Sequence, residues 1–236
     1  MLIRALIESE YAGQTEALAA SENFQALKAG RAAKEEYDAF IANLCRTHLK
    51  SPQILAFLYS VSAPSAAEQL KHNLLEELGL DEEGINHPRL LLELAEAAGF
   101  DAPLRARLEA DSQEELRRMC ADPLLFGTLK ELGLAVLLEV TCFEWMLSRL
   151  AKSMALLLEA HRGLRRPALR WFYHHSELDR RHAEEGLDAC VDYAEHYGFE
   201  EEDLRSIVEI TFRENVFLKR YFDLSVASHQ ELLASL

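Results

Sequence analysis

The chain has 236 residues, of which 49% are hydrophobic, and these numbers predict one domain, residues 1–236, with a large buried core. Its formal net charge of −15 argues against partners such as nucleic acid or an anionic membrane surface, because both attract basic proteins. No apolar run reaches the ~20 residues of a membrane span, and the N-terminus lacks a signal-peptide layout.

Helical spacing of apolar residues runs through nearly the whole chain, and strand-like alternation is absent, so the predicted fold class is all-α. In chain order, helices are expected over about 14–28, 33–60, 64–79 and 88–99, whereas 101–121 is expected to hold only short helical turns. The longest helix is expected to begin at Asp122-Pro123, with Asp as N-cap, and to end near 160. Two more are expected over about 168–198 and 201–228, which makes one bundle of seven helices.

The sixth expected helix carries His175, Asp179 and His182. At about 100° per residue, positions four and seven apart share one stripe of a helix. The aromatic run that begins at Trp171 indicates that this stripe faces inward, where an Asp needs a partner. A metal ion would be such a partner, and imidazole with carboxylate suits Fe, Mn or Zn. The alternative is a surface helix whose polar residues share a stripe by chance.

Two other segments place ligand-type residues where a core is expected. Glu77 ends one predicted helix and His87 begins the next, so both can point into one cavity, although a solvent-exposed Glu and a loop His would give the same pattern. Glu139 and Glu144 interrupt the apolar surface of the longest helix. A buried charge is costly unless it is paired, so at least one of these two is expected to have a function.

The cysteines are widely spaced and form no CxxC pair: Cys45, Cys120, Cys142 and Cys190. This spacing predicts reduced thiols in a cytoplasmic protein.

Together these residues resemble the heme-oxygenase-like di-iron oxidases and oxygenases, iron-containing redox enzymes whose superfamily includes pyrroloquinoline-quinone synthase and thiaminase II. The resemblance covers most of the chain and begins at the run Phe24–Arg31. It continues through Asn73 and Glu77 followed by His87-Pro88, and its most specific part is Ala168–Tyr173 leading into His175. It implies a seven-helix heme-oxygenase-like bundle, and it implies these metal ligands: Glu77, His87, Glu144, His175, Asp179 and His182.

Glu144 is preferred over Glu139 because its separation from His175 is the one usual in that family. Against this preference, Gly133 stands six residues before Glu139, where the family often has a glycine. The two glutamates are about 140° apart around a helix, so both are not expected to serve equally.

The resemblance implies a non-heme di-iron enzyme that activates O2 and oxidises a small metabolite, such as an amino acid, an amine, a fatty acid or an aromatic precursor. The implied cofactors are two iron ions, the second of them labile, and O2. We therefore expect a small-molecule substrate, and a homodimer is left open. Four aromatic or imidazole side chains are candidates for the cavity or for simple core packing: Tyr37, His48, Tyr173 and Tyr221.

Two other functions are compatible with the sequence. In a metal-free, thiaminase II-like hydrolase, Cys142 would be the nucleophile, although Met146 stands where that branch has an aromatic residue. In a non-enzymatic binding module, for heme or a protein partner, the ligand-type residues would form a polar network in the core.

Overall fold

The computed structural model describes residues 2–82, 84–121 and 126–222, apart from the side chains of 2, 121 and 177–180. Within these ranges the chain forms eleven α-helices and one short 3-10 turn, without a strand. The predicted all-α class is confirmed, and the predicted number of seven helices is wrong. None of the described helices is both long enough and apolar enough to cross a lipid bilayer.

The N-terminal segment holds two helices where one was expected, α1 (Leu2–Ala20) and α2 (Glu22–Lys28). Ser21 separates them, because its hydroxyl accepts a hydrogen bond from the backbone N–H of Phe24 and so caps α2. Serine is a favoured N-cap residue, and such a cap begins a new helix.

The expected helix over 33–60 is also divided, into α3 (Lys34–His48) and α4 (Ser51–Val61). Pro52 is the physical reason. It has no backbone N–H, and inside a helix its ring would clash with the carbonyl four residues earlier, so it is tolerated only in a first turn. The break brings the end of α3 and the start of α4 to the candidate site described below.

The next helices are α5 (Pro64–Leu78), α6 (His87–Ala97) and α7 (Ala102–Ala121). The first two follow the predicted ranges closely. The third is a single helix where only short turns were expected, and it begins where Asp101 accepts a hydrogen bond from the backbone N–H of Leu104.

The longest helix is α8 (Leu129–Arg162), which begins at a capping box formed by Thr128 and Glu131. The start predicted at Asp122-Pro123 lies outside the described residues. A short 3-10 turn η1 (Arg166–Leu169) then leads into α9 (Arg170–His196).

The last described segment contains α10 (Glu201–Thr211) and α11 (Val216–Phe222), where one helix to 228 was expected. Asn215 caps α11 by accepting a hydrogen bond from the backbone N–H of Leu218. The predicted continuation beyond 222 lies outside the described residues.

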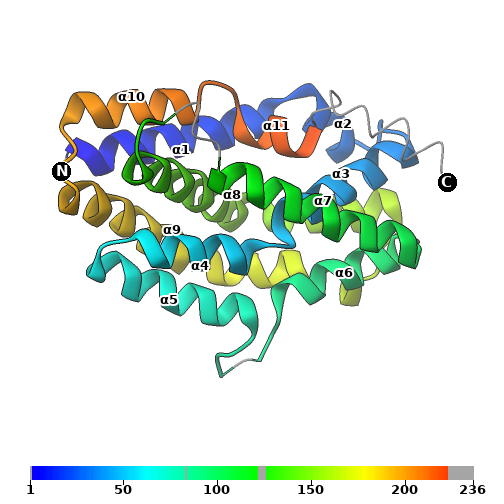
Figure 1. Cartoon of the computed structure of the whole chain (residues 1–236). Coiled ribbons are helices and arrows are strands. Elements are labelled where there is room, and N and C mark those ends of the chain that lie inside the picture. Colours follow the sequence, from blue (N-terminus) through cyan, green and yellow to red (C-terminus); the bar gives the residue numbers. More distant parts are fainter. Residues whose placement is uncertain (1, 83, 122–125, 223–236) are drawn as a thin grey trace.

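The two long helices α8 and α9 pack along each other in the middle of the bundle (Figure 1). On one side α4 packs against α8 and α5 against α9, and on the other side α1 and α10 cover the pair. Further along α8, α3 packs against α6, α7 and α11. The core is mainly aliphatic and aromatic, and a few buried polar side chains gather where α5, α6 and α9 meet.

Candidate metal centre

The site begins at the tight connection between α5 and α6. Gly79 ends α5 with φ +67°, and a Cβ there would lie only 2.8 Å from the backbone nitrogen of Asn86, so the returning loop requires glycine. The Asn86 side chain donates to the carbonyl of Leu78 (3.1 Å) and caps α6 through the N–H of Arg89. As a result, the first side chain of α6 is held against the last turn of α5.

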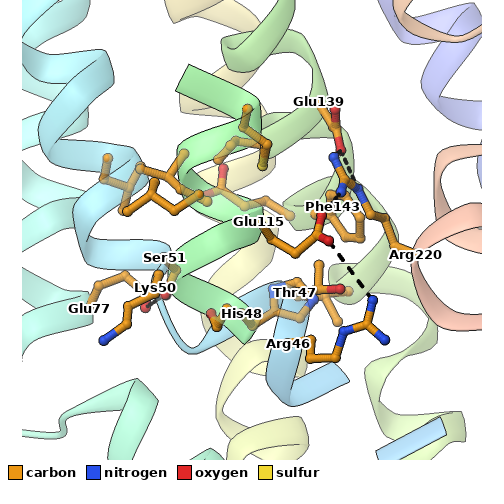
Figure 2. Close-up of a pocket in the computed structure, with 18 of the residues that line it drawn as sticks. Arg46, Thr47, His48, Lys50, Ser51, Glu77, Glu115, Glu139, Phe143 and Arg220 are labelled. Carbon is orange, nitrogen blue, oxygen red and sulfur yellow. Dashed lines mark hydrogen bonds and ion pairs between the residues drawn. The ribbon is translucent and has the colours of Figure 1, made fainter. Parts of the chain in front are cut away.

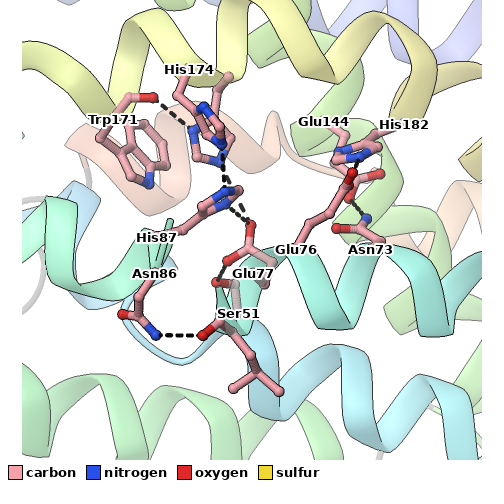
Figure 3. Close-up of polar contacts among 12 residues, drawn as sticks. Ser51, Asn73, Glu76, Glu77, Asn86, His87, Glu144, Trp171, His174 and His182 are labelled. Carbon is pink, nitrogen blue, oxygen red and sulfur yellow. Dashed lines mark hydrogen bonds and ion pairs between the residues drawn. The ribbon is translucent and has the colours of Figure 1, made fainter. Parts of the chain in front are cut away.

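This connection brings Glu77 and His87 together, with His87 Nδ1 2.7 Å from Glu77 Oε1. From α9, His175 Nε2 lies 3.6 Å from the same oxygen. All three side chains are buried, and one potential ligand atom from each lies within 4.8 Å of the others. We call Glu77, His87 and His175 the Glu77 cluster. Figure 3 labels Glu77 and His87 at its centre.

The imidazole rings of this cluster are oriented by neighbouring groups. His175 Nδ1 donates to the Trp171 carbonyl at 2.7 Å, which leaves the lone pair of the neutral ring on Nε2, the nitrogen that faces Glu77. On the outer side of His87, its Nε2 lies 2.8 Å from His174 Nε2, so its Nδ1 faces the cluster. Metal-binding histidines are commonly fixed in this way through their second nitrogen.

The electrostatics of the cluster favour an ionised carboxylate. Burial by itself would raise the pKa of the Glu77 carboxyl, but the charge of His87 and hydrogen bonds from His175 and His87 hold that pKa well below its usual value. Burial lowers the pKa of His174 to about 4, with a further contribution from His87, so its ring is neutral at pH 7. The hydroxyl of Ser51 donates to Glu77 Oε2 at 2.5 Å.

A second set of ligand-type side chains lies beside the first. It consists of His72, Glu76 and His182, with one potential ligand atom from each within 4.8 Å of the others, and we call it the Glu76 cluster. His182 Nε2 hydrogen-bonds to Glu76 Oε2, and Arg181 donates to Glu76 Oε1 at 2.5 Å. Burial opposes ionisation of Glu76, but these partners lower its pKa to about 2. His72 is half exposed and lies 3.7 Å from Glu76.

The structure separates the two glutamates of α8. Glu144 accepts a hydrogen bond from Asn73 of α5 and lines the same two cavities as His182. Glu139 instead accepts hydrogen bonds from Arg220 of α11, at 2.9 and 3.0 Å. The structure therefore places Glu144, and not Glu139, beside the Glu76 cluster, and its assignment as a ligand stays a prediction. The predicted ligand Asp179 belongs to α9, and its side chain lies outside the described part of the chain.

The donor set fits iron. Five carboxylate or imidazole side chains from three helices, α5, α6 and α9, gather here, and imidazole with carboxylate is the combination found in non-heme iron sites. These five are Glu76, Glu77, His87, His175 and His182, with Glu144 adjacent. The ionised carboxylates would offset the charge of divalent cations.

A cavity opens directly beside these residues (Figure 2). Glu77, His175 and His182 line it, and apolar side chains such as Phe143 and Leu147 form much of its wall. His48 also lines it. Burial, with a smaller contribution from the charge of His175, lowers the pKa of His48 to about 3, and its Nε2 lies 2.8 Å from the Tyr221 hydroxyl.

Cys142 lies away from this chemistry. It is fully buried, and the described residues that line the cavity do not include it. Burial, reinforced by the charge of Glu139, raises the pKa of its thiol well above the usual value, which suppresses the nucleophilic thiolate. The structure thus gives no support to Cys142 as a nucleophile. In the described ranges all four cysteines are free thiols.

The sequence reasoning missed three side chains of the site: His72, Glu76 and His174. A signal for the first two was present, because His72 and Glu76 are four residues apart and so share a helical stripe. His174 had no such signal, since adjacent residues lie about 100° apart on a helix and His175 was already the ligand candidate.

Comparison with known proteins identifies a family and a fold. A family model described as iron-containing redox enzyme matches residues 38–211, a span that includes every predicted ligand. No curated protein matches the chain. Among solved structures, a domain of unknown function with a heme oxygenase-like fold, from Shewanella denitrificans OS217, is similar over 98% of this chain and 94% of its own. The TM-score is 0.65 and the sequence identity 18%, so this likeness shows the fold alone.

Proposed function

Because this chain belongs to the family of iron-containing redox enzymes, we propose that it is an oxidoreductase that holds two iron ions and uses O2 to oxidise a small molecule. The observation that carries the proposal is the Glu77 cluster, three buried ligand-type side chains that converge from α5, α6 and α9. The adjoining cavity supports a small-molecule substrate, because it lies directly against these side chains.

In this proposal Glu77, His87 and His175 hold one iron ion. Glu144, Asp179 and His182 hold the other, and Glu76 is added to the second set because it bonds to His182. Asp179 stays in the set on its sequence position, one helical turn from both His175 and His182. Iron bound there would supply the chemistry that activates O2, whose four-electron reduction would take two electrons from the substrate and two from an external reductant.

The protein's own groups have three tasks in this chemistry. The Trp171 carbonyl and His174 hold the rings of His175 and His87, so that each presents a defined nitrogen. The carboxylates of Glu76 and Glu77, already ionised in the folded protein, would offset cationic charge without first having to release protons. The apolar wall that contains Phe143 keeps water away from the reacting end of the substrate.

Iron loading tests the proposal. The purified protein, loaded anaerobically with ferrous iron and freed of excess metal, should contain up to two ions per chain by elemental analysis. His87→Ala and His175→Ala should each lose at least one ion, because each removes a buried ligand of the Glu77 cluster. His196→Ala is the matched control, since it removes an exposed imidazole from the last turn of the same helix, α9. Full iron content in both cluster variants would overturn the assignment.

A further inference from the structure

The cavity beside the metal centre has two chemically different ends. At one end are the carboxylates and imidazoles of the candidate metal centre. At the other end two guanidinium groups, Arg46 of α3 and Arg220 of α11, surround Glu115 of α7 (Figure 2). Apolar side chains line the cavity between them, among them Leu116 and Phe143.

The two arginines differ in how their charge is satisfied. Arg220 donates to Glu139 at 3.0 Å and to Glu115 at 2.7 Å, so its charge is matched by two direct carboxylate partners. Arg46 makes one side-chain hydrogen bond among the described residues, to the neutral amide oxygen of Asn43 at 3.1 Å. Its nearest carboxylate, Glu115, is 4.0 Å away, which is longer than a hydrogen bond.

Arg46 is also largely withdrawn from water, with only 15% of its side chain exposed. A guanidinium has five N–H donors, and a desolvated cation is costly unless an anion or several acceptors satisfy it. The chain as a whole is strongly acidic, so a cation left without a direct carboxylate bond at the wall of a cavity needs a specific explanation.

We propose that this cavity binds a small carboxylic acid, whose carboxylate is held by Arg46 and whose apolar chain lies along Leu116 and Phe143 toward the metal centre. The planar fork of a guanidinium matches a carboxylate through two parallel hydrogen bonds. An amine fits less well, because Arg220 already occupies both Glu115 and Glu139. That such an acid reacts at the metal-centre end of the cavity depends on the proposed function, whereas the inference that it binds there does not.

The test is calorimetric titration of the full-length protein with butanoate, hexanoate and octanoate, and with hexylamine as the amine of matched length. At least one acid should bind, and hexylamine should bind at least tenfold more weakly than hexanoate. Arg46→Gln should lower the affinity for the best-binding acid at least tenfold. Glu115→Gln should raise that affinity, because the substitution removes the negative charge nearest to Arg46. A purely structural role of Arg46 would not produce this increase.

Controls separate binding from folding and from metal coordination. Arg205→Gln removes an exposed arginine from α10 and should leave the affinity unchanged. Arg46→Lys keeps the charge but loses the fork, so it should weaken binding several-fold, and it carries the test if Arg46→Gln does not fold. Each titration is run on metal-free and on iron-loaded protein, and iron content is measured for every variant.

The outcomes are distinguishable from those of the proposed function. Binding that depends on Arg46 in a chain that takes up no iron would sustain this inference and overturn the oxidoreductase. The inference itself fails if no acid binds, if hexylamine binds as tightly as hexanoate, or if Arg46→Gln and Arg46→Lys leave the affinity unchanged. It also fails if acids bind only to iron-loaded protein, because the carboxylate would then be on the metal.

Discussion

The ring of His87 contacts a second imidazole outside the Glu77 cluster, so we expect His174 to act as a positioning residue. The two Nε2 atoms are 2.8 Å apart, and this contact fixes which nitrogen of His87 faces Glu77. The contact also gives an expected role to the partly buried histidine that directly precedes the ligand candidate His175.

For His174→Ala we expect metal affinity to fall roughly tenfold or more, the usual effect of losing a group that orients a ligand. The measurement is a competition titration with a divalent-metal chelator, for which cobalt is a convenient probe. His174→Gln retains a hydrogen-bonding group and should recover part of the affinity. An affinity equal to wild type in His174→Ala would show that the contact has no positioning role.

Loss of Glu144 should change iron content, whereas loss of Glu139 should change stability. Glu144→Ala removes a carboxylate beside His182, so we expect iron content to fall while the fold is retained. Among the described residues, Glu139→Ala leaves Arg220 with Glu115 as its one carboxylate partner, so we expect a loss of about 1–2 kcal/mol in the free energy of unfolding, with iron content unchanged.

Urea unfolding and elemental analysis of the same preparations measure both quantities. The reverse pattern, with iron lost in Glu139→Ala and retained in Glu144→Ala, would show that the chosen register of α8 is wrong.

At the level of elements, the approach of α8 and α9 depends on a glycine. Gly186 of α9 faces Thr141 of α8, and a Cβ at this position would lie 2.7 Å from Thr141 Cγ2 and 2.8 Å from its Cβ. Thr141 has little room to move, because its hydroxyl donates to the Leu137 carbonyl and also contacts Tyr11. The two helices that carry Glu144 and His182 are therefore held in close contact.

Gly186→Ala should cost about 1–3 kcal/mol in the free energy of unfolding, the usual effect of overpacking a core. It should also weaken metal binding, because it moves α9 relative to α8. Gly13→Ala is the matched control: it lies within α1, and a Cβ there has no neighbour within 4 Å. That variant should be stabilised by roughly 0.5–1 kcal/mol, since alanine is the better helix former. Chemical denaturation of wild type and the two variants measures these differences. A Gly186→Ala protein as stable as wild type would contradict the close approach of α8 and α9.

For the whole molecule, the candidate metal ligands join four helices from two separate parts of the sequence, α5 and α6 in the first and α8 and α9 in the second. A metal ion that binds the folded chain but not the unfolded one stabilises the fold by mass action. At a free metal concentration one hundred times the Kd, the gain is about 2.7 kcal/mol. For a chain of this size that corresponds to a rise in Tm of roughly 5–10 °C.

Thermal unfolding with ferrous iron under anaerobic conditions, and again after addition of a chelator, measures this difference. His87→Ala should show a much smaller rise than wild type. An identical Tm with and without metal in the wild-type protein would argue against a site that spans these helices.

Local sequence predicted the helical class and several helix ends well. Gly79 and Gly163 end α5 and α8 in the left-handed conformation, and the spacing of His175 and His182 predicts that they share one stripe of α9. Three of the four additional helices arise because Ser21, Pro52 and Asn215 act as breaks within segments of continuous apolar periodicity, and the fourth is α7, where only short turns were expected. A single cap or proline leaves the apolar periodicity on both sides of it intact, so the periodicity alone predicts one continuous helix.

The sequence alone therefore determined an acidic, all-α chain with histidines on an inward-facing stripe and carboxylates on other helices. Only the tertiary structure decided which carboxylate meets which histidine. Glu76 and Glu77 are neighbours in sequence, yet one bonds to His182 and the other to His87. The physical reason is that helical periodicity sets the direction of a side chain around its own helix. The partner it reaches depends on how α5, α6 and α9 pack together, and that packing is a property of the whole core.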